Sequence, residues 1–478
     1  MILRLSVALA IVTAMAAFPQ TSSAAPEHPD VLFIAIDDLN DWTSALGGHP
    51  QARTPNLDRL MARGVTFTNS HCAAPACNPS RAALMSGLRP FETGIYTNGD
   101  PAESVMRETL TLNRHFMAEG YRTIGGGKIY HNLAAEGRKD SWTEWVGIFP
   151  TGGKKIENIN GLNRSHFDWG PLEATTEDMG DTKLTDWAIG ELNKASDQPL
   201  FLAVGYVKPH LPWYVPREYF DRFPIDKIEL PAFRDDDIDD IPPAGLKLTG
   251  TDHAAVLEGD QWQKGVQGYL ATISYLDDQI GRLLDGLDKS PRAGKTVIVL
   301  WSDHGWHLGE KEHWRKFALW EEATRTVLTI TAPGVTQEAA MCSAPVDFMS
   351  IYPTVCELAG LAVPDHVKGA SLVPLLRNPR ADWDGVALCT HGRQNHAVRD
   401  ARYRYIRYAN GDEELYDHDS DPMEYDNLAG YTSLEEIKTR LGKRMPKQEV
   451  NPVPGGESEK KAKGKGKSNG KNKGKKEA

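Results

Sequence analysis

The run Val31-Leu32-Phe33-Ile34-Ala35-Ile36 is followed directly by two acidic residues, Asp37-Asp38. An uninterrupted apolar run of this length predicts a strand that is buried on both faces of a parallel sheet. A second run, Thr296-Val297-Ile298-Val299-Leu300-Trp301, has the same character and ends in Ser302-Asp303-His304-Gly305. The two runs together favour an α/β protein over an all-helical or all-β one.

The segments around these runs complete the predicted fold. An amphipathic pattern from Tyr269 to Leu287 precedes the Thr296 run and predicts a helix. Strands that alternate with such helices form a large, mainly parallel sheet sandwiched by helices. After about Leu376 the pattern changes to shorter, aromatic and arginine-rich strands such as 403–408. We therefore expect an α/β fold with a smaller C-terminal α+β subdomain.

Four segments are expected along the 478 residues. Residues 1–24 have the positive start, short apolar stretch and small-residue cleavage site of a signal peptide, which predicts export to the periplasm or the exterior. An uncleaved anchor is the alternative; no later stretch is long enough to span a membrane, so no stable membrane insertion is expected. The other segments are a main N-terminal domain (25–376), a C-terminal subdomain (377–448) and a disordered Lys/Gly-rich tail (449–478).

The charge is distributed unevenly along the chain. Residues 460–478 hold nine lysines and one glutamate, and subtracting this +8 from the net charge of −11 leaves −19 on the remainder. A main body this acidic argues against nucleic acid as a partner.

The acidic residues after the two apolar runs predict a metal site. Ligands of open α/β sheets bind beyond the carboxyl ends of the strands, so both acidic clusters should face one crevice. Asp37, Asp38 and Asp303 would supply the hard oxygen ligands that Ca²⁺ or Mg²⁺ prefers. The alternatives are a helix-capping cluster after the first run and an exposed loop after the second.

A cysteine motif, Cys77-Asn78-Pro79-Ser80-Arg81, is followed by Met85-Ser86-Gly87. Proline is favoured in the first turn of a helix, whose free N–H groups attract anions. Ser80 is a candidate cap, and Arg81 carries a permanent charge suited to an oxyanion or to orienting a nucleophile. The alternative is an ordinary helix start in which Cys77 forms a disulfide.

Basic residues occur near the ends of other predicted segments. Lys128 and His131 follow a glycine run that allows close approach of the backbone to a ligand, and His210 ends the strand-like run that begins at Leu200. Lys316 lies thirteen residues after Asp303. Their spacing alone does not distinguish these side chains from solvated ones.

The cysteine motif and the segments above resemble the type I sulfatases, a branch of the alkaline phosphatase superfamily. The resemblance extends from about Pro29 to Leu428, and the Lys-x-x-His and Asp-His spacings are closest to iduronate-2-sulfatase-like exosulfatases. Ser86 and Leu88 depart from the usual family residues without touching the motif core. The resemblance implies an alkaline phosphatase-like fold and a sulfuric ester hydrolase.

In that family the motif cysteine is oxidised to formylglycine by a maturation enzyme, and its hydrated aldehyde is the nucleophile. The resemblance thus implies formylglycine at Cys77 and a Ca²⁺ or Mg²⁺ site. It adds His304 and the modified Cys77 to the metal ligands. It also implies roles for the basic residues: His210 as general acid beside Lys316, His131 as base, Lys128 and Lys316 as sulfate ligands, and Arg81 as the group that orients the nucleophile.

The expected substrate is a sulfated carbohydrate, in particular a 2-O-sulfated uronic acid at a chain end. Large aromatic residues near the motifs are candidates for stacking on sugar rings, although such residues are more often core: Trp213, Tyr214, Trp306, Trp314 and Trp320. Trp306 is assigned to substrate binding on this basis. Four basic residues of the subdomain are candidates for binding a uronate carboxylate: Arg393, His396, Arg399 and Arg402.

Two other functions remain open from the sequence. A phosphonate or phosphate monoester hydrolase of the same superfamily would share the cysteine motif. A non-catalytic binder of sulfated glycans would leave Cys77 a thiol. If Cys77 is oxidised, four cysteines remain for up to two disulfides, with no pairing favoured: Cys72, Cys342, Cys356 and Cys389.

Overall fold

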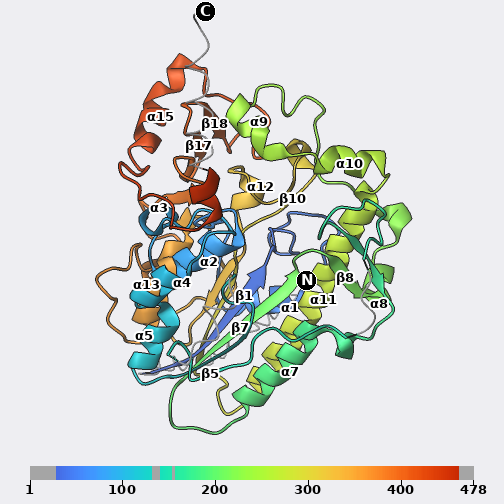
Figure 1. Ribbon diagram of the computed structural model, residues 1–478. Coiled ribbons are helices and arrows are strands. Elements are labelled where there is room, and N and C mark those ends of the chain that lie inside the picture. Colours follow the sequence, from blue (N-terminus) through green and yellow to red (C-terminus); the bar gives the residue numbers. More distant parts are fainter. Residues whose placement is uncertain (1–27, 132–139, 153–156, 462–478) are drawn as a thin grey trace, which may run out of the picture.

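The computed structural model describes residues 28–131, 140–152 and 157–461. The predicted signal peptide (1–24) and residues 462–478 of the predicted tail lie outside the described residues. A central sheet of eight strands is covered by helices, and a smaller four-stranded sheet follows toward the C-terminus (Figure 1). The predicted α/β class with a C-terminal α+β subdomain is therefore confirmed.

The two apolar runs form the middle of the large sheet. β1 (Asp30–Asp37) pairs in parallel with β9 (Thr296–Ser302) on one side and with β7 (Leu200–Pro209) on the other. Within this sheet only β12 (Leu328–Thr331) is antiparallel to both of its neighbours. In spatial order the strands are β13 (Ala340–Cys342), β2 (Val65–Phe67), β12 (Leu328–Thr331), β9 (Thr296–Ser302), β1 (Asp30–Asp37), β7 (Leu200–Pro209), β4 (Arg122–Gly127) and β5 (Glu144–Trp145).

Side chains of β1 alternate between two hydrophobic cores. Val31 and Phe33 belong to the core beneath one helical layer, whereas Leu32 and Ile34 belong to the core beneath the other. Both faces of β1 are fully buried, which explains why its sequence is continuously apolar instead of alternating.

One helical layer packs on β7 and contains the predicted amphipathic helix. That helix, α11, begins seven residues earlier than expected, because Gly265 and Gly268 allow its first turns to lie against Trp314 and Trp169. The helices of this layer are α1 (Pro55–Met61), α7 (Gly180–Leu192) and α11 (Trp262–Asp288).

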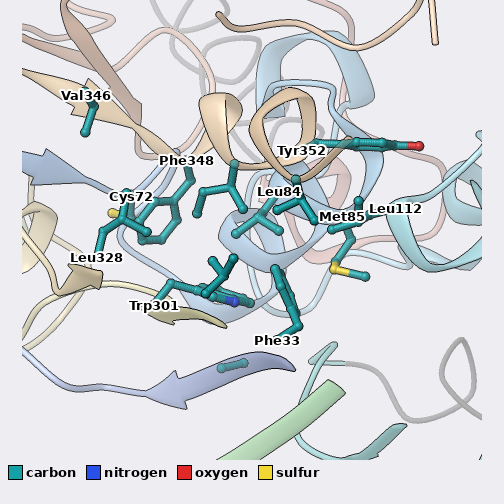
Figure 2. Packing of buried hydrophobic residues seen from close by; sticks show 14 of the residues in the cluster. Phe33, Cys72, Leu84, Met85, Leu112, Trp301, Leu328, Val346, Phe348 and Tyr352 are labelled. Carbon is teal, nitrogen blue, oxygen red and sulfur yellow. The ribbon is translucent and has the colours of Figure 1, made fainter. Parts of the chain in front are cut away.

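The other layer packs on the opposite face. Figure 2 shows Phe33 of β1 and Trp301 of β9 below Leu84 and Met85 of α2, with Tyr352 of α13 in the same cluster. The helices of this layer are α2 (Cys77–Ser86), α5 (Leu112–Ala118) and α13 (Ile351–Leu358). Helix α2, which begins at the motif cysteine, is buried along its whole length.

Shorter elements connect these layers. The other helices are α3 (Pro90–Thr93), α4 (Glu103–Glu108), α8 (Arg217–Asp221), α9 (Pro243–Thr249), α10 (Asp252–Glu258), α12 (Glu321–Thr324) and α14 (Val373–Arg377). The two-stranded sheets are β10 (His307–Leu308) with β11 (Trp314–Arg315), β14 (Val346–Asp347) with β3 (Ser70–His71), and β6 (Trp169–Leu172) with β8 (Trp213–Pro216). No helix in the described ranges has the length and apolar character needed to cross a membrane.

The C-terminal sheet is antiparallel and is flanked by α15 (Glu435–Gly442). Its strands are β15 (Ala387–Thr390), β16 (His396–Arg399), β17 (Tyr403–Arg407) and β18 (Glu413–Asp417). Arg404 of β17 is buried and pairs with Glu321 of α12 and with Glu424, which ties this sheet to the main domain.

The segment after α15 differs from the predicted tail. Val450 and Val453 donate backbone hydrogen bonds to Phe91 and Gly94 of the main domain. The predicted tail therefore starts too early, since residues 449–461 pack on the fold. All five cysteines are free in this structure, and the Sγ atoms of Cys72 and Cys389 lie 3.8 Å apart.

Candidate active site

The acidic residues after β1 and β9 meet at the carboxyl edge of the sheet. The parallel register places Ile36 opposite Ser302, so the chain leaves both strands at the same level. The amide of Asp303 donates to the carbonyl of Ile36 at 3.1 Å, and the amide of Asp38 donates to Asp303 Oδ1 at 3.1 Å. Asp38 has a left-handed backbone (φ 66°), a conformation that aspartate tolerates better than most residues.

Five potential metal ligands converge there. One ligand atom from each lies within 4.8 Å of the others, and all five residues are buried: Asp37, Asp38, Cys77, Asp303 and His304. Nε2 of His304 lies 3.3 Å from Cys77 Sγ and 3.3 Å from Asp38 Oδ1. The crevice predicted from the two strands therefore contains the full predicted ligand set.

Helix α2 presents Cys77 to this cluster. Cys77 is its first residue and Ala76 its N-cap, so Cys77 lies among the free N–H groups of the first turn. The capping role predicted for Ser80 is wrong, because Ser80 lies inside the helix and its hydroxyl donates to the Asp303 carbonyl at 2.6 Å. Asn78 was not among the residues predicted to serve the site. Its backbone amide donates to Asn98 Oδ1 at 3.0 Å and so fixes the turn.

Arg81 fixes two of the carboxylates. Its Nε donates to Asp303 Oδ2 at 2.7 Å, and one terminal nitrogen donates to Asp37 Oδ1 at 3.3 Å. The same guanidinium also donates to backbone carbonyls of Ile36 and Ile129. Arg81 is fully buried, so these bonds satisfy a charge that would otherwise be very costly to bury.

Two lysines approach the other carboxylate oxygens. Lys128, directly after β4, pairs with Asp37, and Lys316 Nζ lies 2.8 Å from Asp38 Oδ1. Lys316 also lies over the ring of Trp306, 4.8 Å from its centroid. Both ammonium groups therefore flank the site that the carboxylates and Cys77 define.

Glycine is required at position 205, where the backbone of Lys128 passes close to β7. A Cβ atom on Gly205 would lie 2.4 Å from the Lys128 carbonyl carbon and oxygen, which is backbone that cannot rotate away. The amide of Lys128 donates to the Gly205 carbonyl at 2.7 Å, so this close approach sets the position of the lysine.

We expect Gly205→Ala to lower the free energy of unfolding by about 1–3 kcal/mol, because it overpacks a buried strand pair. Activity should fall as well, because Lys128 is displaced. Gly190→Ala on α7 is the matched control, since its Cβ would meet no atom within 4 Å and alanine favours helix. Denaturant unfolding of both variants checks this; equal stabilities would contradict the packing argument.

Two histidines complete the site. Nε2 of His210, just after β7, lies 3.8 Å from Asp38 Oδ2, and its side chain is 28% exposed while the carboxylate is buried. His131 lies beside Cys77 and helps to lower the pKa of its thiol. His210 thus stands at the solvent side of the site and His131 beside the cysteine.

The charges around Cys77 favour an anion. Burial alone would raise the pKa of Cys77, but Lys128, Lys316 and His304 hold it well below its ordinary value. Burial likewise opposes ionisation of Asp37, yet Lys128, with His210 and Arg81, keeps its pKa below normal. Asp303 differs, because burial raises its pKa to about 7 despite Arg81.

Trp306 does not occupy the position predicted for it. The Trp306 side chain is 1% exposed, and its ring packs against the ammonium group of Lys316. Its assignment to substrate stacking is therefore corrected to a role in positioning Lys316. Trp213, Trp314 and Trp320 are equally buried, and the half-buried Tyr214 donates its hydroxyl to Asp168. For the tryptophans, the alternative of core packing applies.

Of the four basic subdomain residues, three are engaged elsewhere. His396 is buried against Glu449, Arg399 is buried near Glu321, and Arg402 pairs with Asp417 beside a separate cavity. These residues are corrected to structural partners. Arg393 and Arg402 are both exposed, but Arg402 is held by Asp417.

The donor set fits a hard divalent cation. Three buried carboxylates and one imidazole lie within reach of a common centre, and carboxylate oxygens are the ligands that such cations prefer. Burial is the main cause of the raised pKa of Asp303, and repulsion by the Asp37 carboxylate adds to it; a cation would relieve that repulsion.

Comparison with known proteins agrees with this chemistry. The sulfatase family model matches residues 29–361, and the C-terminal model of N-sulphoglucosamine sulphohydrolase matches residues 309–451. The chain belongs to the sulfatase family. It is therefore a sulfuric ester hydrolase of the alkaline phosphatase superfamily, and the family implies formylglycine and a metal.

Two relatives and one solved structure illustrate the similarity. A sulfatase of Formosa agariphila is 40% identical over 88% of this chain and 87% of its own length. Human iduronate 2-sulfatase is 30% identical over 70% of each chain. The phosphonate monoester hydrolase of Agrobacterium radiobacter shares the fold with a TM-score of 0.74, at 21% identity over 87% of this sulfatase and 94% of the hydrolase.

Proposed function

We propose that this sulfatase removes sulfate from a chain-end sugar of a sulfated polysaccharide, in particular a 2-O-sulfated uronic acid. It would use formylglycine formed from Cys77 by a maturation enzyme, together with Ca²⁺. The observation that carries the proposal is the buried set of Cys77, three aspartates and His304, flanked by Lys128 and Lys316. The similarity to human iduronate 2-sulfatase supports the choice of sugar.

The residues divide the reaction between them. Lys128 and Lys316 bind the sulfate oxygens and stabilise the charge that develops there, while Arg81 holds Asp37 and Asp303 in place. A cation held by Asp37, Asp38, Asp303 and His304, with the modified residue 77, would supply a further positive charge to the same oxygens.

Two proton transfers fall to the histidines. His210 protonates the departing alkoxide from the solvent side, beside Lys316. His131, next to residue 77, accepts the proton that must be lost before the enzyme-bound sulfate can leave. Export by the 1–24 signal peptide would place this enzyme in the periplasm or outside the cell, where sulfated polymers occur.

The fate of Cys77 tests the proposal. Tandem mass spectra of the tryptic peptide Gly64–Arg81, from protein exported by its own host, should show an aldehyde in place of the thiol. That protein should also desulfate 2-O-sulfated uronides. An unmodified thiol in protein that still binds sulfated glycan would favour a non-catalytic binder instead.

A second candidate is a phosphonate monoester hydrolase, favoured by the shared fold with the Agrobacterium enzyme. Turnover of matched aryl sulfate, aryl phosphate and aryl phosphonate esters separates the two. A preference for the phosphonate would make sulfate hydrolysis a side activity.

We expect His210→Ala to lower kcat for alkyl and sugar sulfates by about 10²–10⁴-fold, the usual contribution of a general acid. Nitrophenyl sulfate should lose much less, because nitrophenolate departs without protonation. Equal losses with both leaving groups would show that His210 does not deliver this proton.

A further inference from the structure

A cavity of about 670 Å³ is lined by the chain neighbours of two residues of the candidate site, Cys77 and Lys316. Its walls include Ala76, which precedes Cys77, and Phe317, which follows Lys316. Asn98, the residue that binds the amide of Asn78, also lines it. The opposite wall comes from the C-terminal subdomain, through His391, Arg393 and Asn395. The volume lies in the range that holds one small ligand.

Phe317 is presented to this cavity by a strained backbone. Its φ is +77° and that of Arg315 is +75°, values that bulky side chains rarely adopt. Two bonds hold the turn: the amide of Phe317 donates to the Pro75 carbonyl at 3.0 Å, and the Lys316 carbonyl lies 2.8 Å from His313 Nε2. Such strain persists only where surrounding contacts impose it, and it concentrates at functional sites.

The ring of Phe317 is half-buried and lies between two polar groups of the site. Lys316 Nζ is 5.7 Å from its centroid, and the His391 ring is 6.2 Å away at 40°. An aromatic face in this position offers an apolar platform to a ring that carries the sulfate.

Arg393 is the cation of the cavity that has no carboxylate partner. The described residues place no carboxylate within ion-pair distance of its guanidinium; its side chain hydrogen-bonds with Tyr96, and Glu449 is near without pairing to it. Both oxygens of Glu449 are already engaged, one by His396 at 3.0 Å and one by the amide of Gln394 at 2.9 Å. Lys461, the other cation in the wall, pairs with Glu457 at 2.6 Å.

His391 is suited to a neutral partner. Its Nδ1 is buried and accepts no hydrogen bond from the described residues. Burial, reinforced by the charges of His313 and Lys461, lowers the pKa of His391 to about 4, so the ring is neutral near pH 7. A neutral imidazole with an unpartnered nitrogen matches a hydroxyl group of a sugar, whereas the Asn395 amide is already bonded to the His391 carbonyl and the Ala409 amide.

From these contacts we infer that the cavity binds the sugar ring of the leaving group, with Phe317 as the stacking platform and Arg393 as the ligand of a second anionic substituent. This inference rests on the proposed function, because it assumes that the sulfate is bound at Cys77. The second anion is a carboxylate or another sulfate, both of which pair well with a guanidinium.

The test compares substrates that do and do not reach Arg393. Arg393→Gln should raise KM by roughly 10-fold or more for a 2-O-sulfated uronide or for a disulfated sugar. The value of kcat/KM should stay within about two-fold of the parent enzyme for nitrophenyl sulfate and for a monosulfated neutral sugar. The substrate with the larger loss identifies the second anion as carboxylate or sulfate.

Two further variants sharpen the comparison. Phe317→Leu should lower kcat/KM about 10-fold for every sugar sulfate but not for a small alkyl sulfate, because only stacking is lost. Arg402→Gln is the matched control. This arginine of the same subdomain pairs with Asp417 and lines another cavity, so KM and kcat/KM should be unchanged for all substrates.

Three outcomes overturn the inference. Equal losses for Arg393→Gln on charged and neutral sugars would show a structural role for the arginine. Unchanged KM for both charged sugars, in an enzyme that hydrolyses them, would refute the anion site while leaving the sulfatase function intact. No hydrolysis of any sulfate by formylglycine-containing protein would refute the proposed function itself, and with it this inference.

Discussion

Cys77→Ala is expected to reduce turnover of every sulfate ester by roughly 10⁶-fold, the scale on which loss of a nucleophile acts. In the proposed reaction the oxidised side chain of this residue forms the bond to sulfur, and no other side chain of the cluster could replace it. Cys77→Ser should behave in the same way where the maturation enzyme accepts only cysteine.

The fold should survive this change. Helix α2 is held by Arg81, Ser80 and Asn78, whose bonds to Asp303 and Asn98 do not involve the thiol. Thermal unfolding of Cys77→Ala should therefore stay close to that of the parent enzyme.

Cys342→Ala provides the control. Cys342 is buried in β13 at the edge of the sheet, so its variant should keep full activity. If Cys77→Ala retained more than a trace of turnover in protein free of parent enzyme, the role assigned to Cys77 would be wrong.

Removal of divalent cations is expected to lower activity by at least about 10³-fold, because a cation at the proposed site would stabilise charge on the sulfate oxygens. Without it, the Asp37 and Asp38 carboxylates remain paired with Lys128 and Lys316 and compete with the sulfate for these ammonium groups. Adding back Ca²⁺ or Mg²⁺ to the stripped enzyme should restore turnover, and the ion that does so more completely tests the proposal of calcium.

Metal binding has a readout that does not depend on turnover. A cation that binds only the folded state raises the unfolding temperature as its concentration increases. Asp303→Asn should weaken binding by at least about 10-fold in calorimetry, since it removes a charged ligand and a partner of Arg81.

Asp277→Asn is the matched control for this measurement. Asp277 is also a buried carboxylate, but it accepts hydrogen bonds from the amides of Asn56 and Leu57, away from the cluster. Its variant should lose stability and keep its metal affinity. Equal metal affinities for Asp303→Asn and the parent enzyme would exclude Asp303 as a ligand.

Local patterns in the sequence were sufficient for the framework of the site. Continuous apolar runs identify strands buried on both faces, and acidic residues at their ends must meet if the strands are parallel neighbours, as β1 and β9 are. The motif at Cys77 predicts a helix start because proline two residues later is favoured in a first helical turn. The α/β fold follows from these features, and the sulfatase family from the resemblance of the Cys77 motif and the other segments to that family.

The tertiary structure decided which of several similar side chains serve the site. Arg393, Arg399 and Arg402 look alike in the sequence, yet strand register turns Arg399 inward toward Glu321 and loop geometry brings Arg402 to Asp417. Trp306, which was expected to stack on the sugar, is buried, whereas Phe317, to which the sequence assigned no role, lines the cavity because the backbone at Arg315 and Phe317 is left-handed.

The physical reason is the range of the interactions. Burial of a strand and the start of a helix depend on neighbours within a few residues, so the sequence by itself determined the strands, the helix at Cys77 and the acidic ends that form the ligand set. Exposure of an arginine or an aromatic ring depends on contacts between the main domain and the C-terminal subdomain. Only the tertiary structure brings those distant segments together, and it alone decided the walls of the cavity.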